Sequence, residues 1–372
     1  MSVYWNSRTK GLNPYVPGEQ PPQNKKIIKL NTNENPYPPA PAVMRLIRKA
    51  VDPTIRLYPD PESVELRNII AEKYAVEPDE VFVGNGSDEV LAFAFAAFFE
   101  QSSGGEEDET LPILFPDITY SFYPVYAELF GIPYETPPLN DDFCIDPKDY
   151  RKACGGVVFA SPNAPTGISV ELPALRSVIN YQGKKNKVVI LDQAYAIFTG
   201  KSTKVTTSLV HRYPNLLTVH TLSKANSLAG LRVGFAIGNK ELIQGLVRIR
   251  DSFNSYTMDR LAQVGATAAI SATRYYKTVA KRIIATRERI AGELSKLKIQ
   301  VIPSEANFLF IRIPGMEGAK VSAALKRKGI LVRHFDKPRI KDYIRVSIGT
   351  DEDMDFVLEQ FKDILSKKKA AK

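Results

Sequence analysis

Short apolar runs recur along the chain and predict buried strands. Each run is rich in Val, Ile, Leu or Phe and is bounded by polar residues, Gly or Pro. The runs cover residues 81–84, 111–115, 156–160, 187–191 and 216–219. We expect these segments to form the interior of a sheet.

Other segments carry apolar residues at helical spacing. In residues 41–50, Val43, Leu46 and Ile47 fall on one face of a helix. A second helix is expected over residues 63–74, with Ser63 as its N-cap. Further helices are expected over residues 90–99, 240–250 and 258–297.

The two ends of the chain differ from its middle. Residues 1–40 are rich in Pro, Asn and Gln, and the prolines exclude a long helix, so we expect an extended arm. Residues 100–110 are polar and acidic and predict an exposed loop. The last part alternates between a strand at 301–311, a helix at 320–328, and strands at 329–333 and 343–350.

Composition narrows the class of protein. With 372 residues and 44% hydrophobic content, the chain has enough material for two or three compact units. The net charge of +9 is spread along the chain without a nucleic-acid-binding motif, so we expect no nucleic-acid partner. The apolar run over 90–99 is too short to span a bilayer, and no signal segment opens the chain, so we expect a cytoplasmic protein without a membrane partner.

Metal chemistry is not expected either. Cys144 and Cys154 lack metal-ligand spacing and are too few for a disulfide framework. His211, His220 and His334 are scattered without a cluster of Cys or carboxylate residues. The sequence therefore predicts no protein metal site.

A lysine follows one of the predicted strands among small hydroxyl and apolar residues. Lys224 lies within residues 221–235, directly after the strand at 216–219, and Arg232 follows eight residues later. A lysine amine is nucleophilic only when neutral, and burial or a nearby cation lowers its pKa toward that state. The segment indicates a Schiff-base lysine, with an ordinary loop lysine as the alternative.

Two further polar groups stand where predicted strands end. Asp192 closes the run at 187–191, where a carboxylate is costly unless it is paired. The turn of Gly86, Ser87 and Asp88 opens a helix, and the free N–H groups of a helix N-terminus can bind phosphate. A helix cap at Asp192 and a simple tight turn at Gly86 are the alternatives.

Two more segments carry polar residues in or directly after a predicted strand. Residues 161–167 form a Pro/Asn/Gly cluster after the strand at 156–160, and open α/β sheets bind ligands at such carboxyl ends. Arg345 lies in the apolar strand at 343–350, where a permanent cation must find an anion. Its planar fork suits a carboxylate.

Together these motifs resemble those of the fold-type I pyridoxal-phosphate (PLP) enzymes, and specifically the class I/II aminotransferases. The resemblance extends from about Leu12 to Thr350 with the motifs in the family's order. It implies an α/β PLP-dependent transferase fold of type I, with a mainly parallel large-domain sheet flanked by helices and a small α+β domain. The implied bounds are an arm at 1–40 that packs with the small domain or a partner subunit, a large PLP-binding domain at 41–260, and a small domain at 261–372.

The resemblance also implies roles for single residues. Lys224 matches the lysine that carries PLP and then moves the substrate proton, Asp192 matches the partner of the pyridine nitrogen, and Tyr195 completes the expected catalytic set. Tyr195 and Asn163 match residues that hydrogen-bond the phenolic oxygen of PLP, and Tyr120 matches the aromatic residue that stacks on its ring.

The cofactor's phosphate would be held by a separate group of residues, with Arg232 as its cation. The other residues expected to bind the cofactor are Gly86, Ser87, Asp88, Thr221, Ser223 and Tyr58. In the family, the tyrosine matched by Tyr58 reaches the neighbouring subunit's site, which implies a homodimer.

Residues 12–18 and 30–36 resemble the two N-terminal signatures of the histidinol-phosphate aminotransferases. The resemblance gives Arg345 the substrate carboxylate, gives Arg333 and the arm residue Tyr15 a substrate phosphate, and adds Asn33 to the substrate-binding set. It implies transamination between histidinol phosphate, as the small-molecule amino donor, and 2-oxoglutarate in histidine biosynthesis. For Arg333, a surface salt bridge is the alternative.

Three positions depart from the family's common pattern. Ser161 and Ala164 remove no group that the chemistry requires, whereas Gln193 stands where the family usually has Glu and changes the charge beside Asp192. Three other functions stay open at this point. They are a lyase resembling threonine-phosphate decarboxylase, an aromatic amino acid aminotransferase, and a non-catalytic ligand sensor with the PLP fold.

Overall fold

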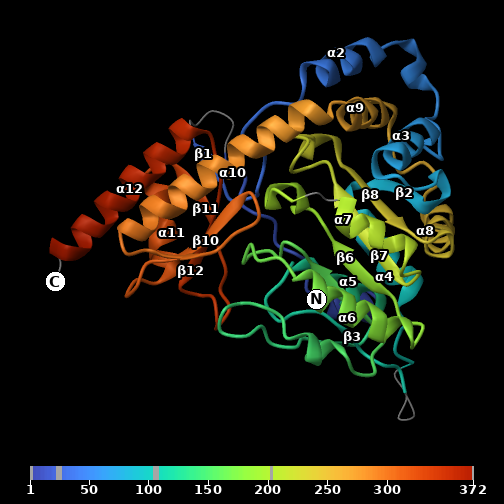
Figure 1. Cartoon of the computed structure of the whole chain (residues 1–372), viewed down its shortest axis with the longest axis horizontal. Coiled ribbons are helices and arrows are strands. Elements are labelled where there is room, and N and C mark those ends of the chain that lie inside the picture. Colours follow the sequence, from blue (N-terminus) through green and yellow to red (C-terminus); the bar gives the residue numbers. More distant parts are fainter. Residues whose placement is uncertain (1–2, 22–26, 104–108, 202–203, 371–372) are drawn as a thin grey trace.

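The computed structural model describes residues 3–21, 27–103, 109–201 and 204–370, and its strands form two sheets (Figure 1). Pro22 of the predicted arm, residues 104–108 of the predicted acidic loop, and the last two residues of the basic tail lie outside the described residues. A short helix, α1 (Ser7–Gly11), lies in the otherwise extended arm.

The larger sheet has seven strands in the order β2-β8-β7-β6-β5-β3-β4. The pairings from β7 to β4 are parallel, and those of β8 with β2 and β7 are antiparallel. The strands are β2 (Val81–Asn85), β3 (Ile113–Leu114), β4 (Tyr134–Glu135), β5 (Gly156–Ala160), β6 (Val189–Asp192), β7 (Leu216–Thr221) and β8 (Val233–Gly238). All five apolar runs are strands of this sheet, and the predicted mainly parallel arrangement is confirmed.

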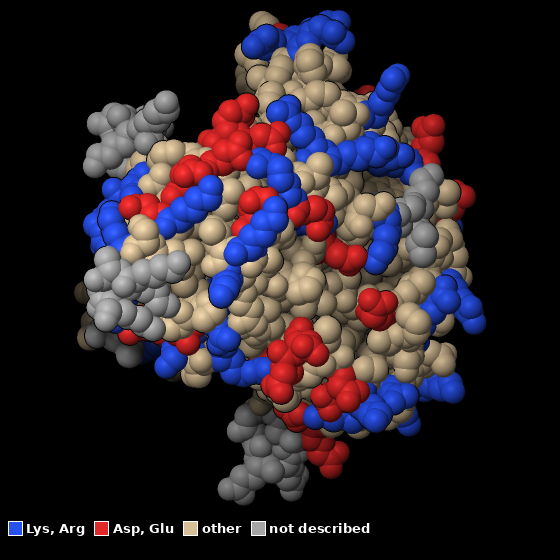
Figure 2. All heavy atoms as spheres, turned by 60° about the vertical axis from the view of Figure 1, so that its left-hand side comes forward, with Lys and Arg blue, Asp and Glu red and all other residues tan. Residues whose placement is uncertain are grey.

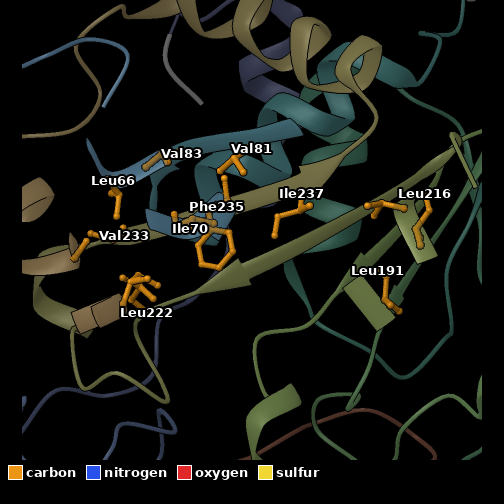
Figure 3. Close-up of a cluster of buried hydrophobic side chains, with 14 of the residues drawn as sticks. Leu66, Ile70, Val81, Val83, Leu191, Leu216, Leu222, Val233, Phe235 and Ile237 are labelled. Carbon is orange, nitrogen blue, oxygen red and sulfur yellow. The ribbon is translucent and has the colours of Figure 1, made fainter. Parts of the chain in front are cut away.

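Helices cover both faces of this sheet, which explains why its strands are apolar throughout. In β8, Val233, Phe235 and Ile237 join one hydrophobic cluster, while Ala236 joins the cluster on the opposite face. Figure 3 shows the first cluster, where Phe235 lies near Ile70.

One face packs on α2, α3, α6 and α9, and the other on α4, α5 and α8. Their bounds are α2 (Pro41–Ala50), α3 (Val64–Tyr74), α4 (Gly86–Phe98), α5 (Phe122–Phe130), α6 (Leu172–Gly183), α8 (Lys240–Phe253) and α9 (Arg260–Ser271). A further short helix, α7 (Lys204–Thr207), follows β6. Short 3₁₀ turns occupy Pro53–Arg56, Pro78–Glu80, Pro147–Tyr150, Ala196–Thr199, Ser208–His211 and Ala229–Leu231.

The expected helix at 63–74 is confirmed, but the expected cap is wrong. Ser63 has a left-handed backbone with φ 48°, and its side chain makes no capping hydrogen bond. An N-cap side chain serves the first turn from an extended backbone, which Ser63 does not have. Asp60 takes this role instead, because its Oδ2 accepts a hydrogen bond from Val64 N at 2.8 Å.

The smaller sheet combines the two ends of the chain, in the order β1-β11-β12-β10-β9. Its strands are β1 (Ile28–Leu30), β9 (Gln300–Ile302), β10 (Phe308–Arg312), β11 (Ile330–His334) and β12 (Tyr343–Ser347). The helices α10 (Thr273–Lys296), α11 (Gly318–Arg327) and α12 (Asp351–Ala370) accompany it. The strand β1 of the arm pairs in parallel with β11, which ties the arm to this sheet.

The single strand expected over 301–311 is instead two antiparallel strands, β9 and β10. The chain reverses between them, and Phe310 pairs with Ile302. Ser304 donates to Phe308 O at 2.6 Å across the turn, and Pro303 has no N–H to continue a ladder. The apolar run therefore folds back on itself.

The helix α9 packs against α2 and α3 beside the larger sheet. The long helix α10 begins after α9 and runs toward the smaller sheet (Figure 1). The division of the chain at residue 260 stays a prediction, and we propose that the boundary lies after α9.

Charges of both signs alternate on the face shown in Figure 2 rather than gathering by sign. Among the described residues, no helix is long and apolar enough to cross a membrane. Within the same ranges, His, Cys, Asp and Glu form no group of three or more that could hold a metal ion.

Candidate active site

A cavity of about 280 Å³ opens where β5, β6 and β7 end. The carboxyl ends of parallel strands are where sheets of this kind bind ligands. Predicted site residues that line it are Ser87, Asp88, Tyr120, Asp192, Tyr195, Thr221, Ser223, Lys224 and Arg232. The fold thus brings together residues from four separate segments of the chain.

Lys224 lies in the turn between β7 and β8, with its amine inside the protein. Its Nζ donates to the carbonyl oxygen of Thr32 at 2.9 Å. Burial, and after it the neighbouring cation Arg345, lower the pKa of Lys224 to about 8, while Glu34 opposes the shift. A neutral, nucleophilic amine is therefore far more abundant here than on a surface lysine.

The lowered pKa predicts how the free protein reacts with amine reagents. In protein without cofactor, we expect the rate of Lys224 modification to rise with pH and reach half its maximum near pH 8, because only the neutral amine reacts. Mass spectrometry of the peptide that contains Lys224 measures this rate. Lys201 has a raised pKa beside Glu305 and serves as the internal control. A midpoint for Lys224 as high as that of Lys201 would contradict the prediction.

Asp192 ends β6 and is buried. Its Oδ1 accepts a hydrogen bond from Ala194 N at 3.0 Å, and its Oδ2 accepts one from Tyr123 OH at 3.2 Å. Burial raises the pKa of Asp192 to about 6, against these two hydrogen bonds. At neutral pH the carboxylate is mostly an anion in a desolvated site, which favours pairing with a cationic ligand group.

The first turn of α4 and Arg232 form a cradle suited to phosphate. Arg232 Nη2 donates to Asp88 Oδ2 at 2.9 Å, and Arg232 Nη1 lies 3.5 Å from Ser223 Oγ. Tyr120 OH donates to the other oxygen of Asp88 at 2.8 Å. The cradle combines an arginine fork, hydroxyl groups and the free N–H groups of a helix N-terminus, which together fit a phosphate dianion.

Gly86 keeps this cradle open. Its backbone has φ +81°, and a Cβ at this position would lie 2.7 Å from Arg232 Nη2. We expect Gly86→Ala to weaken PLP binding about tenfold, because the positive φ would strain an alanine by roughly 1–3 kcal/mol and the added Cβ would push Arg232 out of the cradle.

Ultrafiltration with PLP measures this affinity. Gly230→Ala is the matched control, since a Cβ there would meet nothing within 4 Å. Equal affinities for the two variants would refute a steric role for Gly86.

Tyr195 and Asn163 differ in how many of their hydrogen-bonding groups are already paired within the protein. The Tyr195 hydroxyl accepts from Asn33 Nδ2 at 2.9 Å, which leaves its own hydrogen available to a ligand. The Asn163 amide donates to Ile118 O at 2.9 Å and to Thr166 Oγ1 at 3.1 Å. Both amide hydrogens of Asn163 are thus engaged, and its contact with a cofactor stays a prediction.

The predicted substrate residues form a second group next to the cavity. Arg345 and Arg333 are register partners on β12 and β11. Arg345 Nη2 donates to Asn31 O at 3.0 Å, and its Nε is buried without a hydrogen-bond partner among the described residues. Burial lowers the pKa of Arg345, and Arg333 adds to this effect. Two neighbouring cations with an unused donor form a site for an anion.

The arm brings Tyr15 close to the two arginines. The ring centroids of Tyr15 and Phe122 are 4.4 Å apart, and Arg333 Nη2 donates to Val16 O at 3.3 Å. Asn33 lies on the other side, where its N–H donates to Ser347 Oγ at 2.9 Å. The arm therefore forms one wall of the substrate region.

Tyr58 lies apart from these residues in its own chain. Its side chain is 78% exposed and stacks on Tyr256 with ring centroids 4.6 Å apart. Val51, Ile55 and Leu57 nearby are also exposed. The structure thus places Tyr58 outside the cavity.

Ser161, Ala164 and Gln193, the positions that depart from the family pattern, each make different contacts. Ala164 lines the cavity, and Ser161 Oγ accepts from Val170 N at 3.0 Å. Gln193 Nε2 donates to Thr206 Oγ1 at 2.6 Å, which connects the end of β6 to the segment that follows.

Several residues that shape the site carry no motif of their own in the sequence. Thr32 supplies the carbonyl that holds Lys224, and Asn35 Nδ2 donates to Lys224 O at 3.1 Å. Gln20 and Glu34 line the cavity, and Tyr123 contacts Asp192. Their only signal was proximity in sequence to a motif, since three of them lie in residues 30–36, Gln20 follows residues 12–18, and Tyr123 follows Tyr120.

The α/β fold and a cavity with a buried lysine, a buried carboxylate and a phosphate cradle define a PLP-dependent enzyme of fold type I. Residues 25–361 match the family described as aminotransferase class I and II. The chain belongs to this family and is an aminotransferase.

Individual relatives agree with this assignment. The chain is 49% identical to a histidinol-phosphate aminotransferase of Clostridium beijerinckii, over 98% of each chain. It is 48% identical to one of Aromatoleum aromaticum, over 98% of this chain and all of the relative. Among solved structures, histidinol-phosphate aminotransferase of Sinorhizobium meliloti in complex with PLP has a TM-score of 0.83 at 23% identity, over 98% of this chain and 99% of that one.

Proposed function

We propose that the protein transfers the amino group of histidinol phosphate to 2-oxoglutarate in histidine biosynthesis. Two arginines carry this proposal: Arg345, which neighbours Lys224, and Arg333, its register partner. An amino donor with a phosphate and an oxo acid with carboxylates both need a cationic site. The identity of 49% to a histidinol-phosphate aminotransferase over nearly the full length supports the choice of substrate. We place the reaction in the cytoplasm, where free thiols such as Cys144 and Cys154 persist.

The site residues divide the work of this reaction. Bound PLP supplies an electron sink for the substrate carbon that loses its proton. Lys224 would hold the cofactor, and its lowered pKa also suits the base that moves that proton near neutral pH. Asp192 binds the protonated pyridine nitrogen, and Tyr195 donates to the phenolic oxygen.

The remaining residues hold anionic groups. Arg232 and the first turn of α4 bind the cofactor phosphate, and Tyr120 covers the ring. Arg345 binds the carboxylate of the oxo acid, and Arg333 with Tyr15 binds the substrate phosphate. The arm residue Asn33 orients Tyr195 through the hydrogen bond between Asn33 Nδ2 and Tyr195 OH.

An absorbance experiment tests the substrate assignment. Protein loaded with PLP is mixed with histidinol phosphate in the absence of any oxo acid. We expect the absorbance of lysine-bound PLP to be replaced by that of pyridoxamine phosphate, and 2-oxoglutarate to restore it. A spectrum that histidinol phosphate leaves unchanged would overturn the substrate assignment, and release of CO₂ would indicate a lyase instead.

We propose that the active protein is a homodimer in which Tyr58 of one subunit reaches the cofactor phosphate of the other. Its 78% exposure and the exposed side chains of Val51, Ile55 and Leu57 support this arrangement, since a dimer would bury this apolar surface.

Mixing two inactive variants tests the shared site. Lys224→Ala and Tyr58→Ala each impair every site of their own homodimers. In a mixed dimer, both changes fall in one site and the other site is intact, so the activity of a refolded mixture should exceed the mean of its parents. If Tyr58 and Lys224 of the same subunit formed one site, or if the protein were a monomer, the mixture would show no such recovery, and the shared site would be refuted.

A further inference from the structure

A tyrosine hydroxyl contacts Asp192 from within the core, and the proposed function gives it no role. Tyr123 lies on α5 and is fully buried, and its OH donates to Asp192 Oδ2 at 3.2 Å. The hydroxyl reaches the residue that is proposed to hold the cofactor's pyridine nitrogen. Tyr123 itself is not among the residues that line the cavity.

Aromatic rings fix the position of this hydroxyl. The Tyr123 ring packs edge-on against Tyr120 and Phe115, with centroids 5.6 and 5.8 Å away, and lies 6.3 Å from Phe95. A tyrosine enclosed in this way loses little further freedom when its OH makes a hydrogen bond. The contact with Asp192 is therefore preorganised by the core.

The charged and titratable groups around Asp192 come from several elements. Asp88 on α4 disfavours its anion, while Lys224 after β7 and the hydrogen bonds from Tyr123 and Ala194 N favour it. Tyr126 and Tyr195 are the other titratable neighbours of Tyr123. Burial raises the pKa of the Tyr123 phenol well above its usual value, so this group keeps its proton and stays a donor.

We propose that Tyr123 is a positioning residue that keeps Asp192 anionic and aimed at the pyridine nitrogen of the cofactor. The inference rests on the proposed function of Asp192. In the resulting chain, Tyr123 OH donates to the carboxylate and the carboxylate accepts from the nitrogen. Without the hydroxyl, the anion loses one of its two hydrogen-bond donors, and the proton shared with the nitrogen moves toward the carboxylate.

The experiment uses holoenzyme reconstituted with PLP that carries ¹⁵N in its ring, because the NMR shift of this nitrogen reports its protonation. Wild type is compared with Tyr123→Phe, Tyr126→Phe and Asp192→Asn. Tyr126→Phe is the matched control, since Tyr126 lies on the same helix and its buried OH has no hydrogen-bond partner among the described residues. PLP affinity, measured by ultrafiltration, is the second readout.

We expect the ¹⁵N signal of Tyr123→Phe to move toward the unprotonated position and its PLP affinity to fall roughly tenfold, as for loss of a hydrogen bond to a charged group. Tyr126→Phe should match wild type. A shift in Asp192→Asn but none in Tyr123→Phe would overturn the inference and leave the role of Asp192 intact. An unchanged signal in Asp192→Asn would overturn both, and equal shifts in the two Tyr→Phe variants would overturn the role of Tyr123.

Discussion

Replacing Lys224 with alanine should reduce transamination by at least ~10⁴-fold, because the proposed function has this one amine both hold the cofactor and move the substrate proton. The buried amine with its pKa of about 8 is the group in the cavity suited to both tasks. The loss should appear in kcat, since the substrate arginines are unchanged. Steady-state assays with histidinol phosphate and 2-oxoglutarate measure it.

Cofactor binding separates this effect from misfolding. Lys224→Ala should still bind PLP reversibly through the Arg232 cradle, and dialysis should remove the cofactor, whereas the wild type retains it. Lys201→Ala is the control, since Lys201 is 71% exposed in its ion pair with Glu305. A Lys224→Ala protein that keeps more than a few per cent of wild-type activity would refute the assignment of this lysine.

Replacing Arg345 with lysine should lower kcat/KM about 10²-fold for the oxo acid while the charge is kept. A lysine presents a point charge and loses the planar fork, and loss of a charge-assisted hydrogen bond costs roughly 1.5–3 kcal/mol. The change should fall mainly on KM for 2-oxoglutarate, because the proposed partner of Arg345 is the carboxylate of the substrate and not the cofactor. Stopped-flow measurement of each half-reaction separates the two substrates.

Arg312→Lys is the control for replacing an arginine by a lysine in this sheet. Arg312 lies on the neighbouring strand β10, where its Nε donates to Gln300 Oε1 at 2.9 Å. This variant should keep wild-type kinetics with both substrates. If Arg345→Lys also left KM unchanged, Arg345 would hold Asn31 O as a structural residue rather than bind substrate.

The strands and the cofactor motifs were readable from the sequence because each is a local pattern. A strand buried on both faces is a short apolar run, and the turn that holds Lys224 follows such a run directly. Asp192 stood out because a carboxylate at the end of an apolar strand needs a partner. The family resemblance then related these motifs to one another.

The predictions that proved wrong concern segments whose local sequence is compatible with two conformations. A polar residue before a helix suggested Ser63 as the cap, but the left-handed backbone there made Asp60 the acceptor. An apolar run suggested one strand at 301–311, but the chain turned at Ser304 to form two. Periodicity does not distinguish these cases.

The sequence by itself determined which residue types and turns the site would have. The tertiary structure alone decided which groups meet, because these contacts join residues far apart in the chain. Lys224 meets Thr32 across 192 positions, and Asn33 meets Ser347 across 314. Tyr123 reaches Asp192 only because α5 packs on the sheet at the end of β6. No local pattern encodes such distances, since they follow from strand order and packing rather than from neighbouring side chains.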